Sequence, residues 1–190
     1  SDLLFDSLVR LSQNTTNAML REAIHSDAEQ IALLVNKAYR PDSGERGWTH
    51  ESELVSGHRI NAEQVASLMN EHGSILVAHE RDNLLGCVHV ERADSYCYIG
   101  MLATMPSQQN QGLGKKLLAA AEDLAVSRYG AQGFKMSVLS SRPELLAYYE
   151  RRGYRLTGSN QPYPAEAGVG RPLNENLQVL ELLKPHHTPA

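Results

Sequence analysis

Two spacings of apolar residues alternate along the chain, and together they predict a sheet flanked by helices. Apolar positions recur at helical spacing after Asp27, from about Ala62 to Glu71, and after Gly112, which predicts an amphipathic helix in each place. A further helix is expected from Pro143, which suits a first helical turn, to Gly153, which suits the position after a helix. Alternating or short apolar runs predict strands within residues 20–24, 74–80, 84–91, 96–104, 134–139, 154–157 and 178–183.

Short turns and the two chain ends complete the expected organisation. Polar turns at 81–83 and 93–94 predict that three consecutive strands form an antiparallel meander. Leu4, Leu8 and Leu11 recur at helical spacing before a polar stretch, which predicts a short N-terminal helix. We therefore expect an N-terminal helical extension and connector at residues 1–18, a single domain at 19–184 and a flexible tail at 185–190.

Composition narrows the class of protein more than it narrows the function. The chain has 190 residues, 42% apolar and 21% charged, which is typical of one soluble globular domain. No stretch approaches the roughly 20 apolar residues of a membrane span. The net charge of −4 argues against binding to nucleic acid and is compatible with a cationic or amine substrate. Cys87 and Cys97 fall in strand-like runs, which favours buried, reduced thiols in a cytoplasmic protein.

The segment from Gln109 to Gly114 is the most informative motif, because its two glycines precede a predicted helix. Glycines permit close approach of the backbone to a ligand, and the N–H groups at a helix N-terminus attract an anion. A P-loop requires a hydroxyl residue after its Gly-Lys pair, and a dinucleotide loop requires a third glycine. Here Gly114 is followed by Lys115, Lys116 and Leu117, so the hydroxyl residue is missing, and Leu117 also occupies the position of the third glycine. The motif therefore predicts a site for a phosphorylated ligand that uses neither of these loops.

Three segments resemble signatures of the GNAT superfamily of acyl-CoA-dependent N-acetyltransferases, and they occur in the family's order. They are Tyr98 to Thr104, Gln109 to Gly114 with the following Lys115 to Leu118, and Ala147 to Tyr154. The order of predicted elements from Met19 to Lys184 is also similar to that of the family. The resemblance implies an α/β (α+β) fold with a mixed, mostly antiparallel sheet of about seven strands flanked by about four helices, here preceded by the short N-terminal helix.

The same resemblance implies acetyl-CoA as the co-substrate and no metal. The strand that ends at Thr104 would splay at a bulge, and Leu102, Ala103 and Thr104 would pair with the pantetheine arm like an added strand. The backbone N–H of Leu102 would polarise the thioester carbonyl. The pyrophosphate would be held by the loop and the start of the helix, at Gln109, Asn110, Gln111, Gly112, Leu113, Gly114 and Lys115.

Candidates for proton transfer lie on a predicted helix and a predicted strand. Tyr149 matches the family's tyrosine that protonates the coenzyme A thiolate, and a phenol with a pKa of about 10 is protonated at neutral pH. Tyr148 faces another side of that helix, which favours core packing. His89 and Glu91 share a strand face with Leu85 and Cys87, so either is a candidate base, and each is also plausible as a surface group.

One position departs from the family pattern. Many members carry an asparagine beside the pantetheine where this chain has Arg142, so that role is not transferred. Arg142 is expected either to contact a phosphate or to be exposed.

The acceptor is expected to lie between the loops at 40–54 and 158–176, in contact with Trp48, His89 and Glu91. The leading hypothesis is an N-acetyltransferase that moves an acetyl group from acetyl-CoA to a primary amine of a small molecule, by direct attack in a ternary complex. Two alternatives stay open, a non-catalytic acyl-CoA-binding sensor module and a protein acetyltransferase that modifies lysine or an N-terminus. We expect no nucleic-acid or membrane partner, and a homodimer is an open alternative to a monomer.

Overall fold

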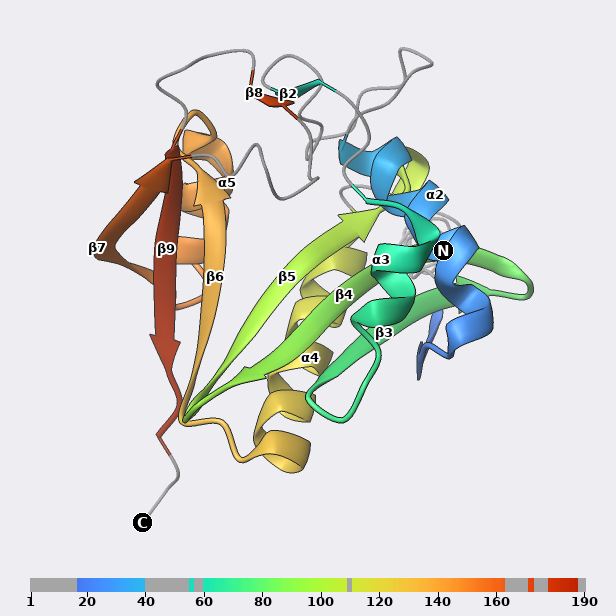
Figure 1. Ribbon diagram of the computed structural model, residues 1–190, viewed down its shortest axis with the longest axis horizontal. Coiled ribbons are helices and arrows are strands. Elements are labelled where there is room, and N and C mark those ends of the chain that lie inside the picture. The colour runs from blue at the N-terminus through green and yellow to red at the C-terminus, as the bar shows by residue number, and fades with distance from the viewer. Residues whose placement is uncertain are drawn as a thin grey trace, which may run out of the picture.

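The computed structural model describes residues 17–39, 55–56, 60–108, 111–162, 171–172 and 178–187. The helix predicted near the N-terminus, Trp48, Gln109 and Asn110 lie outside these residues. Seven of the described strands form one sheet in the order β1-β3-β4-β5-β6-β9-β7 (Figure 1). Their bounds are Met19–Glu22 for β1, Gly73–Glu80 for β3, Asn83–Ala93 for β4, Tyr96–Thr104 for β5, Gly133–Leu139 for β6, Arg155–Pro162 for β7 and Gln178–Pro185 for β9.

Short turns make most of the sheet antiparallel, as the sequence predicts. The strands β3, β4 and β5 form the expected meander. Among the described pairs of this sheet only β5 and β6 are parallel, because the long helix α4 (Leu113–Tyr129) joins them and returns the chain. The last strand, β9, lies between β6 and β7 and is antiparallel to both. The expected mixed, mostly antiparallel sheet is confirmed.

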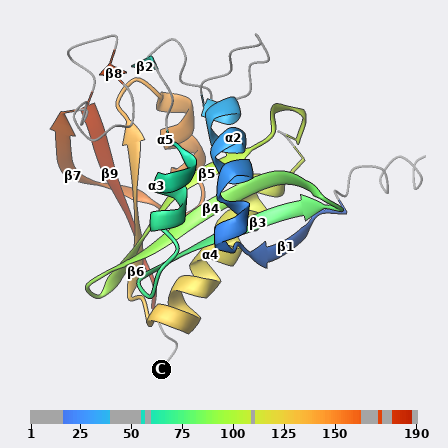
Figure 2. The same ribbon diagram turned by 45° about the vertical axis from the view of Figure 1, so that its right-hand side comes forward.

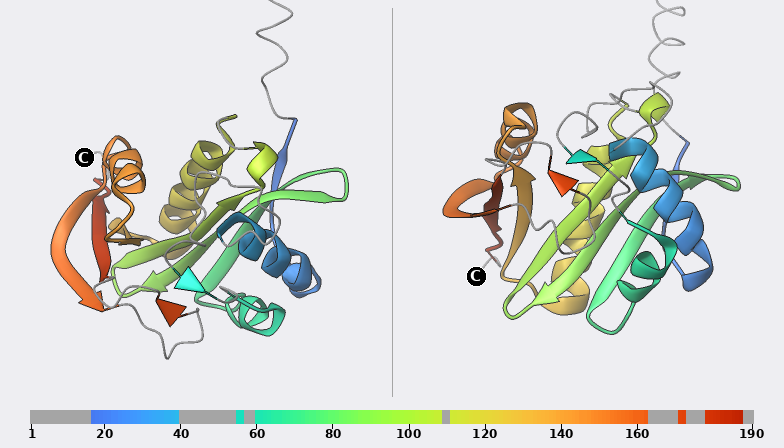
Figure 3. Two further views of the ribbon diagram at one scale, coloured as in Figure 1. Left: turned by 90° about the horizontal axis from the view of Figure 1, so that it is seen from above. Right: turned by 45° about the horizontal axis from the view of Figure 1, so that its top comes forward.

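Helices cover both faces of the sheet. The helices α2 (Ala28–Tyr39) and α3 (Ala62–Ser67) pack on one face, and α4 and α5 (Pro143–Glu150) pack on the other. Figures 2 and 3 show this layering from three further directions. Two short 3-10 turns, η1 (His25–Asp27) and η2 (Pro106–Gln108), precede α2 and α4. The predicted apolar face of α4 is confirmed by the complete burial of Leu113, Leu117, Ala121 and Ala125.

Two local features differ from the sequence expectation. The helix α3 ends at Ser67, before the expected Glu71, because the Asn70 N–H donates to the Gly73 carbonyl and the chain turns into β3. Leu85 packs with the α4-side cluster, whereas Cys87 packs with the α2-side cluster. The prediction that both share one strand face is therefore wrong, since a bulge in the β3–β4 pairing after Ala78 reverses the alternation.

The last strand and its hydrogen bonds extend into the start of the segment predicted as a flexible tail. Pro185 is the last residue of β9, and the His186 N–H donates to the Gln132 carbonyl at 2.9 Å. Residues 188–190 lie outside the described part of the chain.

The described residues also bear on the expected class of protein. Cys87 and Cys97 are both buried and form no disulfide, and they lie on opposite faces of the sheet. None of the helices in the described part of the chain combines the length and the apolar character that crossing a bilayer requires.

Candidate functional site

A bulge interrupts β5 where the family resemblance implies one. Cys87 of β4 lies opposite Ala103, and His89 lies opposite Gly100, so two residues of β5 face one residue of β4. Met101 has a φ of 52°, in the left-handed region that residues other than glycine rarely adopt. The backbone of β5 therefore changes direction immediately before Leu102.

The strands β5 and β6 part soon after they meet. They pair at Cys97 with Phe134 and at Tyr98 with Lys135, whereas β6 stays paired with β9 along its whole length. Figure 1 shows the two strands meeting at one end and diverging toward the end of β5. An extended ligand can add to a strand edge of this kind by main-chain hydrogen bonds.

The side chains on the diverging part of β5 are turned into the protein. Leu102, Ala103 and Thr104 are 8%, 1% and 8% exposed. Leu102 belongs to the α4-side cluster and Ala103 to the α2-side cluster, so the strand is held from both faces. A ligand at this edge would therefore meet backbone and not side chains, which is consistent with the role expected for these three residues.

The N-terminus of α4 combines a fixed helix with an open glycine. Leu113 is fully buried, and the Lys116 N–H donates to the Gly112 carbonyl at 3.2 Å. Gly112 has a φ of 80°, and a Cβ built on it would meet no other described atom within 4 Å. Gln111 and Lys115 are exposed beside it. Backbone N–H groups at such a helix start attract anions, so this end of α4 fits the anion site predicted from the sequence.

Gly114 differs from Gly112 in what a side chain would meet. A Cβ on Gly114 would lie 3.5 Å from the hydroxyl of Tyr148, which is an ordinary van der Waals contact. The conformational requirement for glycine in this loop therefore rests on Gly112, whose positive φ strains any other residue.

Three tyrosines connect α5 with the α4-side core. Tyr149 is 8% exposed, and its ring meets those of Tyr148 and Tyr154 edge to face, with centroids 5.2 Å and 6.1 Å away. Tyr149 belongs to the same buried cluster as Leu102 and Leu113. The candidate acid, the bulged strand and the start of α4 are therefore parts of one packed unit.

Tyr148 occupies a different environment from Tyr149. It is half-buried, as expected of a residue that packs at the core boundary, and burial raises the pKa of its hydroxyl. The guanidinium of Arg152 lies 3.5 Å from the centroid of its ring. This contact replaces part of the hydration that the Arg152 side chain would otherwise have.

The two candidate bases on β4 lie in unlike surroundings. Glu91 is exposed and lies opposite Tyr98 of β5. His89 is largely covered, and its Nε2 is buried without a hydrogen-bond partner among the described residues. A Cβ built on Gly73 would be 3.3 Å from that Nε2, which places the ring against the start of β3. Burial lowers the pKa of His89, and the nearby Glu91 partly opposes this shift.

The lowered pKa of His89 predicts a pH-dependent stability. The unfolded chain binds a proton near the ordinary histidine pKa of about 6.5, whereas the folded chain resists it, so stability is lost as the pH falls through that value. Between about pH 7.5 and 5.5, the unfolding free energy of the natural chain should fall more steeply than that of His89→Gln in urea titrations. The surface variant His72→Gln should keep the natural slope. Equal slopes for His89→Gln and the natural chain would contradict the prediction.

Arg142 is buried, not exposed, which removes one of its two expected environments. Its side chain is 6% exposed at the start of α5 and forms an ion pair with Glu144. A paired guanidinium next to the end of β6 is compatible with a structural role there.

The two loops expected around the acceptor are joined by a second sheet. The strands β2 (Val55–Ser56) and β8 (Arg171–Pro172) follow residues 40–54 and interrupt residues 158–176, and they pair in antiparallel fashion. Trp48 lies outside the described residues. The pairing places the two residues that directly follow the first predicted loop next to two residues within the second.

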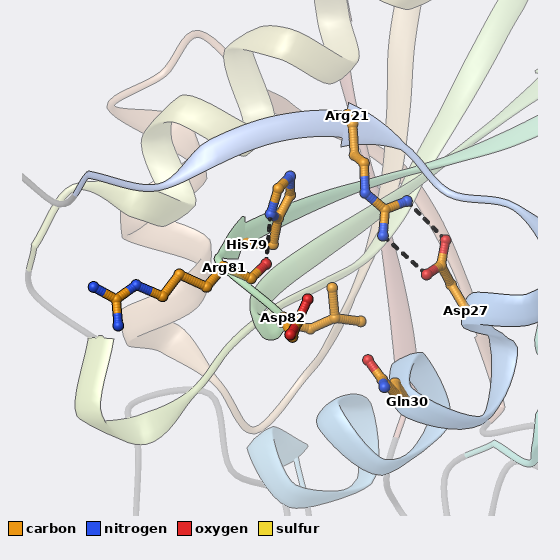
Figure 4. A pocket seen from close by; sticks show the side chains of 7 residues that line it. Arg21, Asp27, Gln30, His79, Arg81 and Asp82 are labelled. Atoms are coloured by element: carbon orange, nitrogen blue, oxygen red, sulfur yellow. Dashed lines mark hydrogen bonds and ion pairs between the residues drawn. The ribbon is translucent and has the colours of Figure 1, made fainter.

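A separate pocket of about 440 Å³ opens at the β1 edge of the sheet (Figure 4). Its lining includes the Arg21–Asp27 ion pair, with contacts of 2.8 Å and 2.9 Å, and His79, whose Nδ1 is hydrogen-bonded to the Arg81 carbonyl. Arg21 holds the pKa of Asp27 below its usual range. None of the residues predicted for acetyl transfer lines this pocket.

Two features of the site escaped the sequence prediction. The left-handed Met101 has no signature in a run of strand-forming residues. A hydrogen bond of 3.1 Å from the Tyr98 hydroxyl to Glu181 joins residues that are 83 positions apart. Only the order of strands in the sheet, which the hydrophobic pattern does not encode directly, could have indicated that pair.

Comparisons with known proteins agree with this architecture. A search of curated protein sequences found no significant match. The IAA acetyltransferase of Bacillus cereus has a TM-score of 0.63 and 18% identity, over 90% of this chain and all of that one. The ribosomal-protein-S18-alanine N-acetyltransferase of Escherichia coli has a TM-score of 0.65 and 15% identity, over 91% of this chain and 96% of that one. A GNAT family acetyltransferase of Elizabethkingia anophelis, with acetyl-CoA bound, has a TM-score of 0.62 and 18% identity, over 90% of this chain and all of that one.

These structures share the fold with the chain, and a sequence comparison identifies the family. The family model described as an acetyltransferase (GNAT) domain matches residues 40–163, which is more than half of the chain. The chain therefore belongs to the GNAT family of acetyltransferases, whose members are N-acetyltransferases.

Proposed function

We propose that this protein transfers an acetyl group from acetyl-CoA to a primary amine of a small molecule, by direct attack within a ternary complex. The observation that carries the proposal is the divergence of β5 from β6 after Tyr98, followed by the bulge at Met101, which leaves Leu102 in one buried cluster with Leu113 at the start of α4. A strand edge for the pantetheine and an anion site for the pyrophosphate are then available side by side.

The chain's own residues have distinct roles in this proposal. Backbone groups of Leu102 to Thr104 bind and orient the thioester arm, and the Leu102 N–H stabilises negative charge on the carbonyl oxygen. The open backbone from Gln111 to Lys115 binds the pyrophosphate. Tyr149 donates its proton to the departing thiolate, and Glu91 is the candidate that takes a proton from the amine.

Each proposed step uses a backbone N–H, a phenol or a carboxylate of this chain. The described residues contain no group of three or more His, Cys, Asp or Glu side chains able to hold a metal ion.

A thiol-release assay tests the proposal directly. The purified protein is mixed with acetyl-CoA and a panel of small amines, and free thiol is measured over time beside samples without acceptor. We expect release that depends on one class of small amine. Acetyl-CoA binding without release for any amine or peptide would favour the acyl-CoA-binding sensor instead. Release with peptides alone would favour a protein acetyltransferase, the class that the Escherichia coli structural neighbour represents.

A further inference from the structure

The face of β6 and β9 that points away from α5 carries a polar row at the point where β5 departs. Cys97 and Ile99 of β5 belong to the α4-side cluster, so the intervening Tyr98 points to the opposite face. Lys135 of β6 and Glu181 of β9 alternate with buried neighbours in the same way. In Figure 1, α2 and α3 lie in front of β3 and β4, and no described helix lies in front of β6 and β9.

Glu181 is held by two hydroxyl groups from different strands. The Tyr98 hydroxyl donates to Oε2 at 3.1 Å, and the Thr157 hydroxyl of β7 donates to Oε1 at 3.2 Å. No lysine, arginine or histidine among the described residues forms an ion pair with this carboxylate. Tyr98 remains 37% exposed, so the pair can be reached from solvent.

The two hydroxyl donors fix the position of the Glu181 carboxylate. A carboxylate held in one geometry is oriented for a further charge-assisted contact. Burial and the neighbouring Glu181 raise the pKa of Tyr98, which keeps its hydroxyl a donor. Exposed Glu91 lies opposite Tyr98 and adds negative charge. The Lys135 ammonium lies 4.9 Å from the ring centroid of Tyr96 and 6.0 Å from that of Tyr98, so it contacts the rings and forms no ion pair with Glu181 among the described residues. A carboxylate held in this way is oriented to bind a cation.

The register of the sheet fixes how far Glu181 lies from the proposed thioester site. Tyr98 is the last residue of β5 that pairs with β6, at Lys135, and Ser137 of β6 pairs with Glu181 of β9. The backbone of Glu181 is therefore two strand spacings from β5, on the order of 10 Å or more from Leu102 because β5 and β6 diverge after Tyr98. That separation is too long for contact with the reacting nitrogen.

Gly100 leaves room beside β5 between the two positions. A Cβ built on Gly100, which lies between Tyr98 and Leu102 on β5, would meet no other described atom within 4 Å. A small acceptor can therefore extend along β5 from the thioester carbonyl to Glu181 without meeting a side chain at Gly100.

We propose that Glu181, held by Tyr98 and Thr157, binds a second cationic group of the acceptor, several bonds away from the amine that is acetylated. The acceptor class is then a diamine or a larger amine with a second positive charge. This inference rests on the proposed function, because it takes the diverging part of β5 as the place where acetyl transfer occurs.

A pair of matched amines tests the assignment. Diaminopentane carries a second ammonium and pentylamine does not, and calorimetry measures the affinity of each for the protein loaded with coenzyme A. The natural chain should bind diaminopentane about tenfold more tightly or better, because a charge-assisted contact is worth about that factor. Glu181→Gln should abolish this preference while leaving the affinity for pentylamine unchanged, and Tyr98→Phe should weaken it about threefold.

The controls separate the failure of this inference from the failure of the proposed function. Asp123→Asn, which neutralises an exposed carboxylate on α4, should keep the full preference for the diamine. Equal affinities for the two amines in the natural chain, or a preference that persists in Glu181→Gln, would overturn the role of Glu181. Failure of coenzyme A to bind would instead contradict the proposed function, and the two amines would still be compared on the protein alone.

Discussion

Gly112→Asp is expected to abolish measurable binding of acetyl-CoA in a protein that still folds. Gly112 has a φ of 80° at the start of α4, and its Cβ would point into open space where the pyrophosphate is proposed to bind. A carboxylate at that point would oppose the phosphate charge and compete for the same N–H groups. Calorimetric titration with acetyl-CoA measures the loss, with circular dichroism as the test of folding.

Gly130 offers a matched control for Gly112→Asp. It ends the same helix with a φ of 63°, and a Cβ there would also meet no described atom within 4 Å. Each substitution forces a residue with a side chain into the left-handed region, at a cost of roughly 1–2 kcal/mol. Gly130→Asp should therefore lose comparable stability yet keep its affinity for acetyl-CoA. A folded Gly112→Asp protein with unchanged affinity would contradict the assignment of the pyrophosphate site.

The sequence predicted those parts of the fold in which the regular spacing of apolar residues matches the side chains that are buried. The spacing of Leu113, Leu117 and Ala121 predicted the buried face of α4 because one stripe of a helix packs on one sheet. Local irregularity was not predictable in the same way. One bulge places Leu85 on the α4 side, and another lies at Met101. Each inserts one extra residue into the strand pairing, and the types of residue in the strand give no sign of it.

In the candidate site too, the residues that belong to local motifs were predictable and those brought together by topology were not. The predicted positions at Gly112, Leu102 and Tyr149 come from local motifs, and the described structure brings the last two into one buried cluster with Leu113. Glu181 carries no local signal, because its neighbours in β9 read as an ordinary strand. Its relation to Tyr98 arises from the insertion of β9 between β6 and β7, a property of topology that hydrophobic alternation does not specify.

Tyr149→Phe is expected to lower turnover about a hundredfold, because general acid catalysis typically contributes that factor or more. The substitution removes one hydroxyl and keeps the ring that meets Tyr148 and Tyr154 edge to face, so the core around α5 should persist. Affinity for acetyl-CoA should change little, since the proposed contacts of the pyrophosphate and the pantetheine are made by backbone groups elsewhere. Steady-state thiol release and calorimetry measure the two quantities separately.

Tyr148→Phe is the matched control for this prediction. It removes a hydroxyl from the adjacent residue of the same helix, one that is half-buried beside Gly114 and Arg152. If the acid is Tyr149, Tyr148→Phe should keep turnover within about twofold, because a hydroxyl outside the reaction contributes no proton transfer. The reverse pattern would assign the proton donor to Tyr148, whose hydroxyl lies 3.5 Å from the position of a Cβ built on Gly114 in the first turn of α4. Full activity in both variants would instead require that the thiolate leave without a proton from either tyrosine.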